Sequence, residues 1–307
     1  TAAPKTVQIL SGAPTNVWSY TGQLLSGSGV TVQSVPGSYL GPILRVRSGT
    51  KVRINFKNDL PEDSVIHPHG LRVPEDCDGH PMQAIGPGQT KIYDFQVIDR
   101  AGPYWFHPHP HMRTAEQVVK GLAGLFYVTD PEEELAVPGA ATGANDVPVV
   151  IQDRVFDSNN QFVYQPNMMW GYLGNRILVN GKPNTVFSLE PRSYRLRLLN
   201  GSNARTYKLA WSNNMPLNVI GTDGGLLPAV ATRNYVMLMP GERIDGDEVA
   251  LVDGMQLPAD PHRPAAAQDQ HRVRVLVALE RGISPRSDLE VAQLGRVVRI
   301  RLGVCGQ

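Results

Sequence analysis

The sequence predicts an all-β protein with two domains. Several short segments alternate between apolar and polar residues with a period of two, which is typical of β-strands. The 30 glycines and 25 prolines suit many short strands joined by tight turns. The chain has 307 residues, of which 41% are hydrophobic, so it can bury two cores of ordinary size.

The first expected strands are 43–47 and 51–56, in which apolar and polar residues alternate as in half-buried strands. Gly49 separates these two segments, and a turn signal follows at 58–61. Later strands are expected on the same grounds, and one short helix is expected at 114–120. These later strands are 92–97, 125–128, 149–151, 271–279 and 296–302.

Composition divides the chain into a first domain at 1–130, a linker at 131–148 and a second domain at 149–307. The linker is rich in Pro, Glu, Ala, Gly and Asn. The second half echoes the first, since 195–200 resembles 53–58 and Pro240-Gly241 resembles Pro87-Gly88. An offset of roughly 140 to 150 residues indicates two copies of one β domain, with chance similarity between strands as the alternative.

The net charge of +1 argues against nucleic acid or an anionic membrane surface as the main partner. No apolar run approaches the length needed to span a membrane. We expect a secreted or periplasmic protein whose signal peptide has been removed, and a cytosolic protein is the alternative. Cys77 and Cys305 permit one disulfide, but two free thiols fit the sequence equally well.

Six of the eight histidines lie between His67 and His111, and four of them form two His-Pro-His segments, at 67–69 and 107–109. Residues i and i+2 of an extended chain point to the same face, with Cα atoms about 6.6 Å apart. Two facing segments would therefore offer four imidazoles to a metal cluster, and imidazole suits copper, zinc, iron and nickel. The alternative, a chance grouping of surface histidines, fits two matched pairs poorly.

The prolines between the paired histidines cannot donate a ladder hydrogen bond, so we expect both segments at sheet edges or loop ends, where a metal and its ligand can enter. His111 is interpreted as a residue behind the ligands or in solvent, and His80 as a loop residue. No role is assigned to His262 or His271.

These segments belong to a longer series of motifs that resembles the multicopper oxidases, and most closely the three-domain bacterial laccases and cuprous oxidases. The resemblance covers roughly residues 41–245 and is specific, because many motifs recur in order. The matching motifs include His67-Pro68-His69-Gly70, Asp78-Gly79-His80-Pro81, 102–109, 121–125, Leu178-Val179-Asn180-Gly181, Ser202-Asn203-Ala204-Arg205, Asp223-Gly224-Gly225 and Pro240-Gly241-Glu242-Arg243.

The resemblance implies tandem cupredoxin-like domains, each a Greek-key β-sandwich or barrel. It also implies that His67 holds a type 2 copper, and that His69, His107 and His109 hold a type 3 copper pair. Asp78 matches a family acid that helps to deliver protons to dioxygen, although it could equally be a turn residue before Gly79. Pro68 stands where the family usually has Trp, and the ligands are unaffected.

The implied function is that of a laccase-type oxidoreductase, which oxidises phenols or metal ions by single electrons and reduces dioxygen to water. The family's third domain supplies His-Pro-x-His-x-His and His-Cys-His motifs, which this sequence lacks. We therefore expect no type 1 copper, a His2Cys site, in the chain as given. The alternatives are a non-catalytic copper-binding or structural cupredoxin protein and, with less support, a zinc hydrolase.

The segment 246–307 differs from the rest, with no aromatic residue, no lysine and eight arginines. One hypothesis is that it is not the native continuation, as a shifted reading of a GC-rich gene could produce. The alternative is that it forms the closing strands of the second domain, since Val298, Ile300 and Leu302 alternate as a strand requires.

Overall fold

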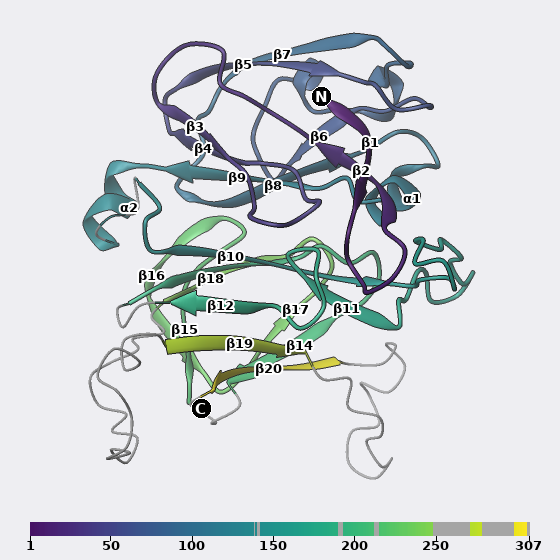
Figure 1. Cartoon of the computed structure of the whole chain (residues 1–307). Coiled ribbons are helices and arrows are strands. Elements are labelled where there is room, and N and C mark those ends of the chain that lie inside the picture. The colour runs from purple at the N-terminus through teal and green to yellow at the C-terminus, as the bar shows by residue number, and fades with distance from the viewer. Residues whose placement is uncertain are drawn as a thin grey trace, which may run out of the picture.

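The structure is a computed structural model that describes residues 1–137, 139, 142–189, 193–211, 215–247, 271–277 and 298–305. For residues 188, 189, 247, 271–277 and 298–305 only the backbone is described. Almost all regular structure in these ranges is β-strand, as the sequence predicts. The strands form an N-terminal unit, β1 to β9, and a C-terminal unit, β10 to β20, one above the other in Figure 1.

The N-terminal unit has one five-stranded sheet, in the order β3-β4-β9-β8-β6, and two two-stranded sheets, β1-β2 and β5-β7. Strands β4 and β9 are parallel, and the other neighbours in the five-stranded sheet are antiparallel. Aromatic and aliphatic residues between it and β5-β7 form the unit's core, to which seven tyrosines and phenylalanines belong and which is called the aromatic core below. The elements are β1 Ala2–Val7, β2 Thr15–Tyr20, β3 Val30–Gln33, β4 Ile43–Arg47, β5 Lys51–Lys57, β6 Ile66–His69, η1 Glu75–Cys77, η2 Pro81–Gln83, β7 Thr90–Gln96, β8 Gly102–Pro108, α1 Thr114–Val119 and β9 Gly124–Thr129.

The C-terminal unit has a six-stranded sheet, β11-β10-β13-β18-β15-β16, and a five-stranded sheet, β12-β19-β20-β14-β17. Aliphatic residues from both sheets form its core. The strands are β10 Asp146–Arg154, β11 Arg176–Val179, β12 Val186–Leu189, β13 Arg195–Asn200, β14 Tyr207–Trp211, β15 Leu217–Thr222, β16 Gly225–Arg233, β17 Val236–Leu238, β18 Arg243–Asp247, β19 His271–Val277 and β20 Val298–Cys305.

The strands and the short helix expected from the sequence are present, with ends that differ by a few residues. The segment interpreted as a linker contains the helix α2, Pro131–Ala136, and β10 begins at Asp146. Asp130 caps α2, because its carboxylate accepts a hydrogen bond from the Glu133 amide at 2.7 Å. The domain boundaries at 130 and 149 stay a prediction.

Two strands of the segment 246–307 are described, and both lie within the five-stranded sheet of the C-terminal unit. Strand β19 pairs with β12 and β20, and β20 pairs in parallel with β14. The ranges 248–270, 278–297 and 306–307 lie outside the described residues, as does His262. The hypothesis that this segment is not the native continuation stays a prediction.

The two units pack through the face of the five-stranded sheet that is opposite to the aromatic core. Trp105, Leu125 and Tyr127 on this face contact Val150 and Leu199 of the C-terminal unit. Both faces of β8 are therefore covered, and all seven of its residues are buried. Because Trp105 and His107 are two residues apart on β8, the histidine side of this strand faces the C-terminal unit.

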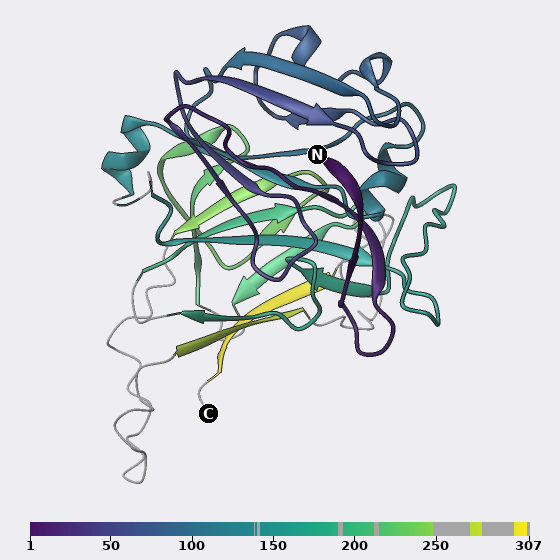
Figure 2. The same cartoon turned by 45° about the horizontal axis from the view of Figure 1, so that its top comes forward.

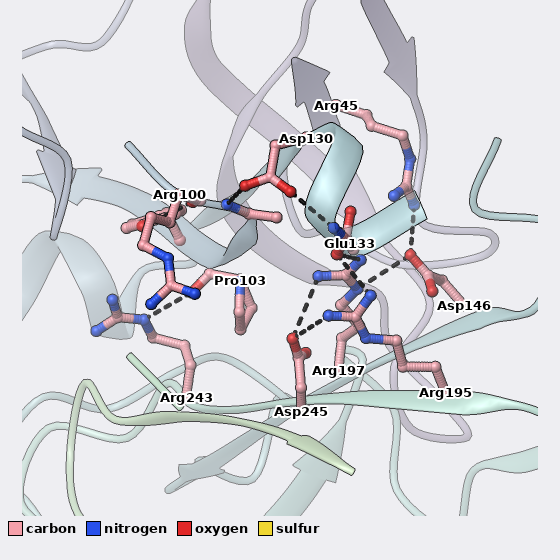
Figure 3. A network of polar contacts seen from close by, with 12 residues as sticks. Arg45, Arg100, Pro103, Asp130, Glu133, Asp146, Arg195, Arg197, Arg243 and Asp245 are labelled. Carbon is pink, nitrogen blue, oxygen red and sulfur yellow. Dashed lines mark hydrogen bonds and ion pairs between the residues drawn. The ribbon is translucent and has the colours of Figure 1, made fainter. Parts of the chain in front are cut away.

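A cluster of six charged side chains, the inter-unit charge cluster, lies beside this apolar contact (Figure 3). Three arginines and three carboxylates pair with one another, and none is more than 7% exposed. Glu133 of α2 accepts hydrogen bonds from Arg195 at 2.6 Å and from Arg197 at 3.0 Å, both on β13. Its six members are Arg45, Glu133, Asp146, Arg195, Arg197 and Asp245.

The inter-unit charge cluster explains why the prediction of a half-buried strand at 43–47 was correct for the strand but not for the exposure of Arg45. Arg45 alternates with apolar neighbours, yet it is buried, because it extends to Asp146 of the C-terminal unit at 2.8 Å. On β13, Leu196 and Leu198 face the core of the C-terminal unit, whereas Arg195 and Arg197 face the N-terminal unit. In these strands the polar face is an interface between units rather than a solvated surface.

Candidate metal centre

Strands β6 and β8 pair antiparallel and bring the two His-Pro-His segments together. His67 lies directly opposite His107, and His69 lies opposite Trp105. Strand β6 is at the edge of its sheet and Pro108 ends β8, as expected from the two prolines. The four rings gather on one face, with centroids 5.2 Å apart for His67 and His107 and 5.2 Å apart for His67 and His109.

The ring nitrogens of three of these histidines converge. Each of His67, His69 and His107 offers a nitrogen that lies within 4.8 Å of the others. The closest pair is His69 Nδ1 and His107 Nε2, which are 3.1 Å apart. Two nitrogens at this separation, on rings from different strands, can bind neighbouring metal ions or share one.

Backbone carbonyls set the orientation of two of the rings. The Asp78 carbonyl lies 2.6 Å from His67 Nδ1, and the Pro108 carbonyl lies 2.8 Å from His107 Nδ1. A carbonyl can only accept, so Nδ1 of each neutral ring carries the proton. The lone pair is then on Nε2, and this is the usual arrangement behind a metal-binding histidine.

Burial keeps the imidazoles neutral. It lowers the pKa of His107 to about 3, against the opposing effect of the Pro108 carbonyl, and the neighbouring imidazoles lower it further. Burial also lowers the pKa of His69 to about 4, with further lowering by Arg243 and the other histidines. The pKa of His109 is lowered chiefly by burial as well. At neutral pH these rings are therefore free to donate lone pairs.

The turn at Asp78-Gly79 is held against β6 at very short range. Gly79 has φ +73, and a Cβ added there would lie 1.9 Å from the Ile66 carbonyl oxygen, so only glycine fits. Tyr93 of β7 holds Ile66 from the other side, because its hydroxyl donates to the Ile66 carbonyl at 3.0 Å and accepts from the Ile66 amide at 2.9 Å. These contacts fix the strand on which His67 lies.

Asp78, the predicted acid, lies at the edge of the histidine group. Its carboxylate Oδ1 is 3.4 Å from His67 Nδ1, and its side chain is 50% exposed. The carboxylate therefore has access both to solvent and to the histidines. The sequence did not predict the contribution of its backbone carbonyl, which orients His67.

The remaining histidines and cysteines lie outside this group. His111 is exposed, and His80 caps η2 by accepting a hydrogen bond from the Met82 amide at 3.2 Å. Cys77 is buried and is a free thiol in the described part of the chain. Cys305 and His271 are described by their backbone only, so the possible Cys77–Cys305 disulfide stays untested.

The C-terminal unit also contributes to the group, although sequence reasoning assigned it no role there. A Cβ placed on Gly241, in the turn between β17 and β18, would lie 3.4 Å from His69 Cε1. On its other side the His69 ring packs against Trp105, with centroids 5.1 Å apart. The Pro240-Gly241-Glu242-Arg243 motif was the available signal, but nothing local shows that it contacts a histidine 172 residues away.

The donors fit a metal site. They are imidazoles, the ligands that copper and zinc accept, and they come from the paired strands β6 and β8 and the residue that follows β8. His109 Nδ1 is buried and has no hydrogen-bond partner among the described residues, which a satisfied structural histidine would have.

No described helix is long and apolar enough to cross a membrane.

Comparison with known proteins identifies the family. A family model described as multicopper oxidase matches residues 16–133. The multicopper oxidase mco of Staphylococcus haemolyticus is 38% identical over 226 residues, which are 71% of this chain and 50% of that protein. The cell division protein FtsP of Escherichia coli is 35% identical over 245 residues, which are 77% of this chain and 51% of that protein.

The solved structures agree with these sequence relatives. A laccase from Pediococcus acidilactici superposes with a TM-score of 0.69 at 35% identity, over 80% of this chain and 50% of that one. The cupredoxin-like all-β fold expected from the sequence is thereby confirmed. The chain spans about half the length of the curated relatives it matches. From its motifs, its fold and these relatives, we conclude that the chain belongs to the multicopper oxidase family.

Proposed function

We propose that His67, His69, His107 and His109 are the copper ligands that this chain contributes to an oxygen-reducing centre. His67 would hold a type 2 copper and the other three a type 3 pair, together forming one half of a trinuclear cluster. The observation that carries this proposal is the convergence of the four rings across β6 and β8, with His69 Nδ1 and His107 Nε2 3.1 Å apart. Family membership supports copper over zinc.

In the proposed reaction, a phenol or a metal ion is oxidised by single electrons and dioxygen is reduced to water. Bound copper would supply the one-electron redox chemistry. The protein's part is to keep the imidazoles neutral by burial and to orient His67 and His107 through the Asp78 and Pro108 carbonyls. We also propose a secreted or periplasmic location, which fractionation of producing cells would test.

Proton supply is the role proposed for the Asp78 side chain. Reduction of dioxygen to water consumes protons, and Asp78 Oδ1 can take them from solvent because half of the side chain is exposed. An Asp78→Asn variant keeps the backbone carbonyl that orients His67, so copper binding should be unchanged. Oxygen uptake should fall about a hundredfold, the usual size of a lost proton-transfer residue.

The test combines elemental analysis with oxygen-electrode measurements on a phenol, using Asp76→Asn as a neighbouring control. Because the sequence as given has no motif for a type 1 copper, oxygen uptake is measured with a type 1 copper domain present. Bound copper together with oxygen uptake supports the oxidase, and slow uptake confined to Asp78→Asn supports the proton role. Zinc in place of copper would contradict the proposal. Equal uptake by the two variants would remove Asp78 from the mechanism.

A second candidate is a copper-binding or structural protein without turnover. It is favoured by one observation, the match to the cell division protein FtsP over 77% of this chain. Copper bound at the four histidines without oxygen uptake, with a type 1 copper domain present and under conditions in which a laccase consumes oxygen, would support this candidate over the oxidase.

A further inference from the structure

Arg243 lies beside the histidine group but belongs to the other unit. It is the first residue of β18, and its side chain is buried. In Figure 3 its guanidinium reaches up to Pro103, on the strand that carries His107. No step of the proposed reaction uses it, so its position next to the candidate ligands needs another explanation.

The guanidinium joins three segments at once. Its Nε donates to the Pro103 carbonyl at 2.9 Å, at the start of β8. Its Nη1 donates to the Gly241 carbonyl at 3.1 Å and pairs with Asp223 Oδ1 at 2.7 Å. The planar fork of arginine allows these contacts to form together, which the single ammonium of lysine cannot reproduce.

The same side chain abuts the residue that follows His69. Gly70 has φ +88, and a Cβ placed there would lie 2.6 Å from Arg243 Nη2. The end of β6, the start of β8 and the β17–β18 turn therefore meet around one guanidinium. Between them lies His69, with its Cε1 side against Gly241 and its ring against Trp105.

We propose that Arg243 is a positioning residue for His69, which it holds by tying the Gly241 turn of the C-terminal unit to Pro103 and against Gly70. Through these contacts, packing of the C-terminal unit sets the ring orientation in which His69 Nδ1 faces His107 Nε2. The inference rests on the proposed function, because it concerns the same candidate ligands. It adds that the second unit takes part in metal binding without supplying a ligand.

The test measures Cu(I) affinity of the full chain by competition with a chromophoric chelator, with Arg243→Met as the main variant. Loss of a residue that orients a ligand commonly costs 10- to 100-fold in affinity, and we expect about tenfold here. Arg243→Lys keeps the charge but not the fork and should also weaken binding several-fold. Arg233→Met removes an exposed arginine of β16 and should change nothing.

A double-mutant cycle with His69→Ala separates positioning from general damage. If Arg243 acts through His69, replacing Arg243 in the His69→Ala background should change the Cu(I) affinity less than twofold. A tenfold effect that persists in the His69→Ala background would overturn the inference, as would wild-type affinity in Arg243→Lys, which would indicate a role for charge alone.

Should Arg243→Met fail to fold, the cycle with Arg243→Lys decides in the same way. If the wild-type chain binds no Cu(I), the proposed function itself fails. If it binds Cu(I) and the Arg243 variants bind equally well, only the positioning role fails.

Discussion

The histidine group and the inter-unit charge cluster are both sets of buried polar side chains, but they differ in ionisation. The charge cluster keeps its charges and pairs them, whereas burial favours the uncharged form in the histidine group. In the charge cluster each arginine faces a carboxylate. Burial works to lower the pKa of Arg197, yet Asp245, Asp146 and Glu133 raise it, so the cation persists. In the histidine group the shifts favour the neutral form.

The difference separates a group that holds the fold together from one that is available to a ligand. Every charged group in the charge cluster has a partner of opposite charge, although Glu133 Oε2, Arg195 Nε and Asp245 Oδ1 make no hydrogen bond among the described residues. In the histidine group the neighbours of the ring nitrogens are mostly other imidazoles: His107 Nε2 lies 3.1 Å from His69 Nδ1, the lone pair of His67 is on Nε2, and the buried Nδ1 of His109 has no partner among the described residues. The unpaired atoms of the charge cluster belong to groups that already face an opposite charge, whereas the histidine group gathers ring nitrogens of one chemical kind, which suits a metal site.

The largest effect is expected from breaking the charge cluster. Arg197→Met removes the cation that contacts Glu133, Asp146 and Asp245, and three buried carboxylates then face only two arginines, so one buried negative charge is uncompensated. The free energy of unfolding in urea should fall by about 3 to 5 kcal/mol. Arg47→Met, at an exposed pair with Glu134, is the matched control and should cost about 1 kcal/mol or less. Similar losses in the two variants would contradict the structural role of the cluster.

An intermediate effect is expected from acid acting on the metal-free chain. His107 and His69 have folded-state pKa values of about 3 and 4, against about 6.5 when unfolded. Below pH 6.5 the unfolded chain therefore binds protons that the folded chain does not. The histidines should contribute their full stabilisation above pH 6.5. The free energy of unfolding should then fall as the pH drops toward 4, by roughly 2 kcal/mol per pH unit, because two groups take up protons on unfolding.

Urea unfolding at pH 7 and pH 5 measures this dependence. His107→Asn should flatten it, whereas replacing the exposed His80 with Asn should leave it unchanged. An unaltered slope in His107→Asn would show that the histidine group is not the source of the acid sensitivity.

The smallest effect is expected from Tyr93→Phe, which removes the hydroxyl that bonds both backbone groups of Ile66. Two hydrogen bonds are lost, so stability should fall by about 1 to 2 kcal/mol. Copper affinity should fall slightly as β6 loosens, while the charge cluster is untouched. No change in unfolding free energy would mean that Tyr93 does not anchor the strand that carries His67.

The contrast between the two regions also shows what the sequence could predict. Spacing alone placed His67 and His69 on one face of a strand, and the two prolines indicated an edge and a strand end. Both conclusions depend on local geometry, and both hold in the structure. The family motifs then supplied the fold class and the identity of the expected metal.

Long-range contacts account for what the sequence did not predict. The alternation at 43–47 indicated a solvated face, but Arg45 is buried because Asp146 of the other unit covers it. Gly241 lies next to His69 only because the two units pack together. The alternation of polar and apolar residues predicts strands, but it does not predict contacts between units. The Asp78 carbonyl was missed because every residue has one, and only the turn at Gly79 aims it at His67.

The central claim is that the four histidines form one copper site, and copper stoichiometry tests it most directly. Elemental analysis of the purified, copper-loaded chain would be compared with that of a His107→Ala, His109→Ala double variant. A His80→Ala, His111→Ala variant, which removes two histidines outside the group, is the control. If the four histidines form one copper site, the first variant loses most of the bound copper and the control loses none. Retention of the parent stoichiometry by the first variant would contradict it.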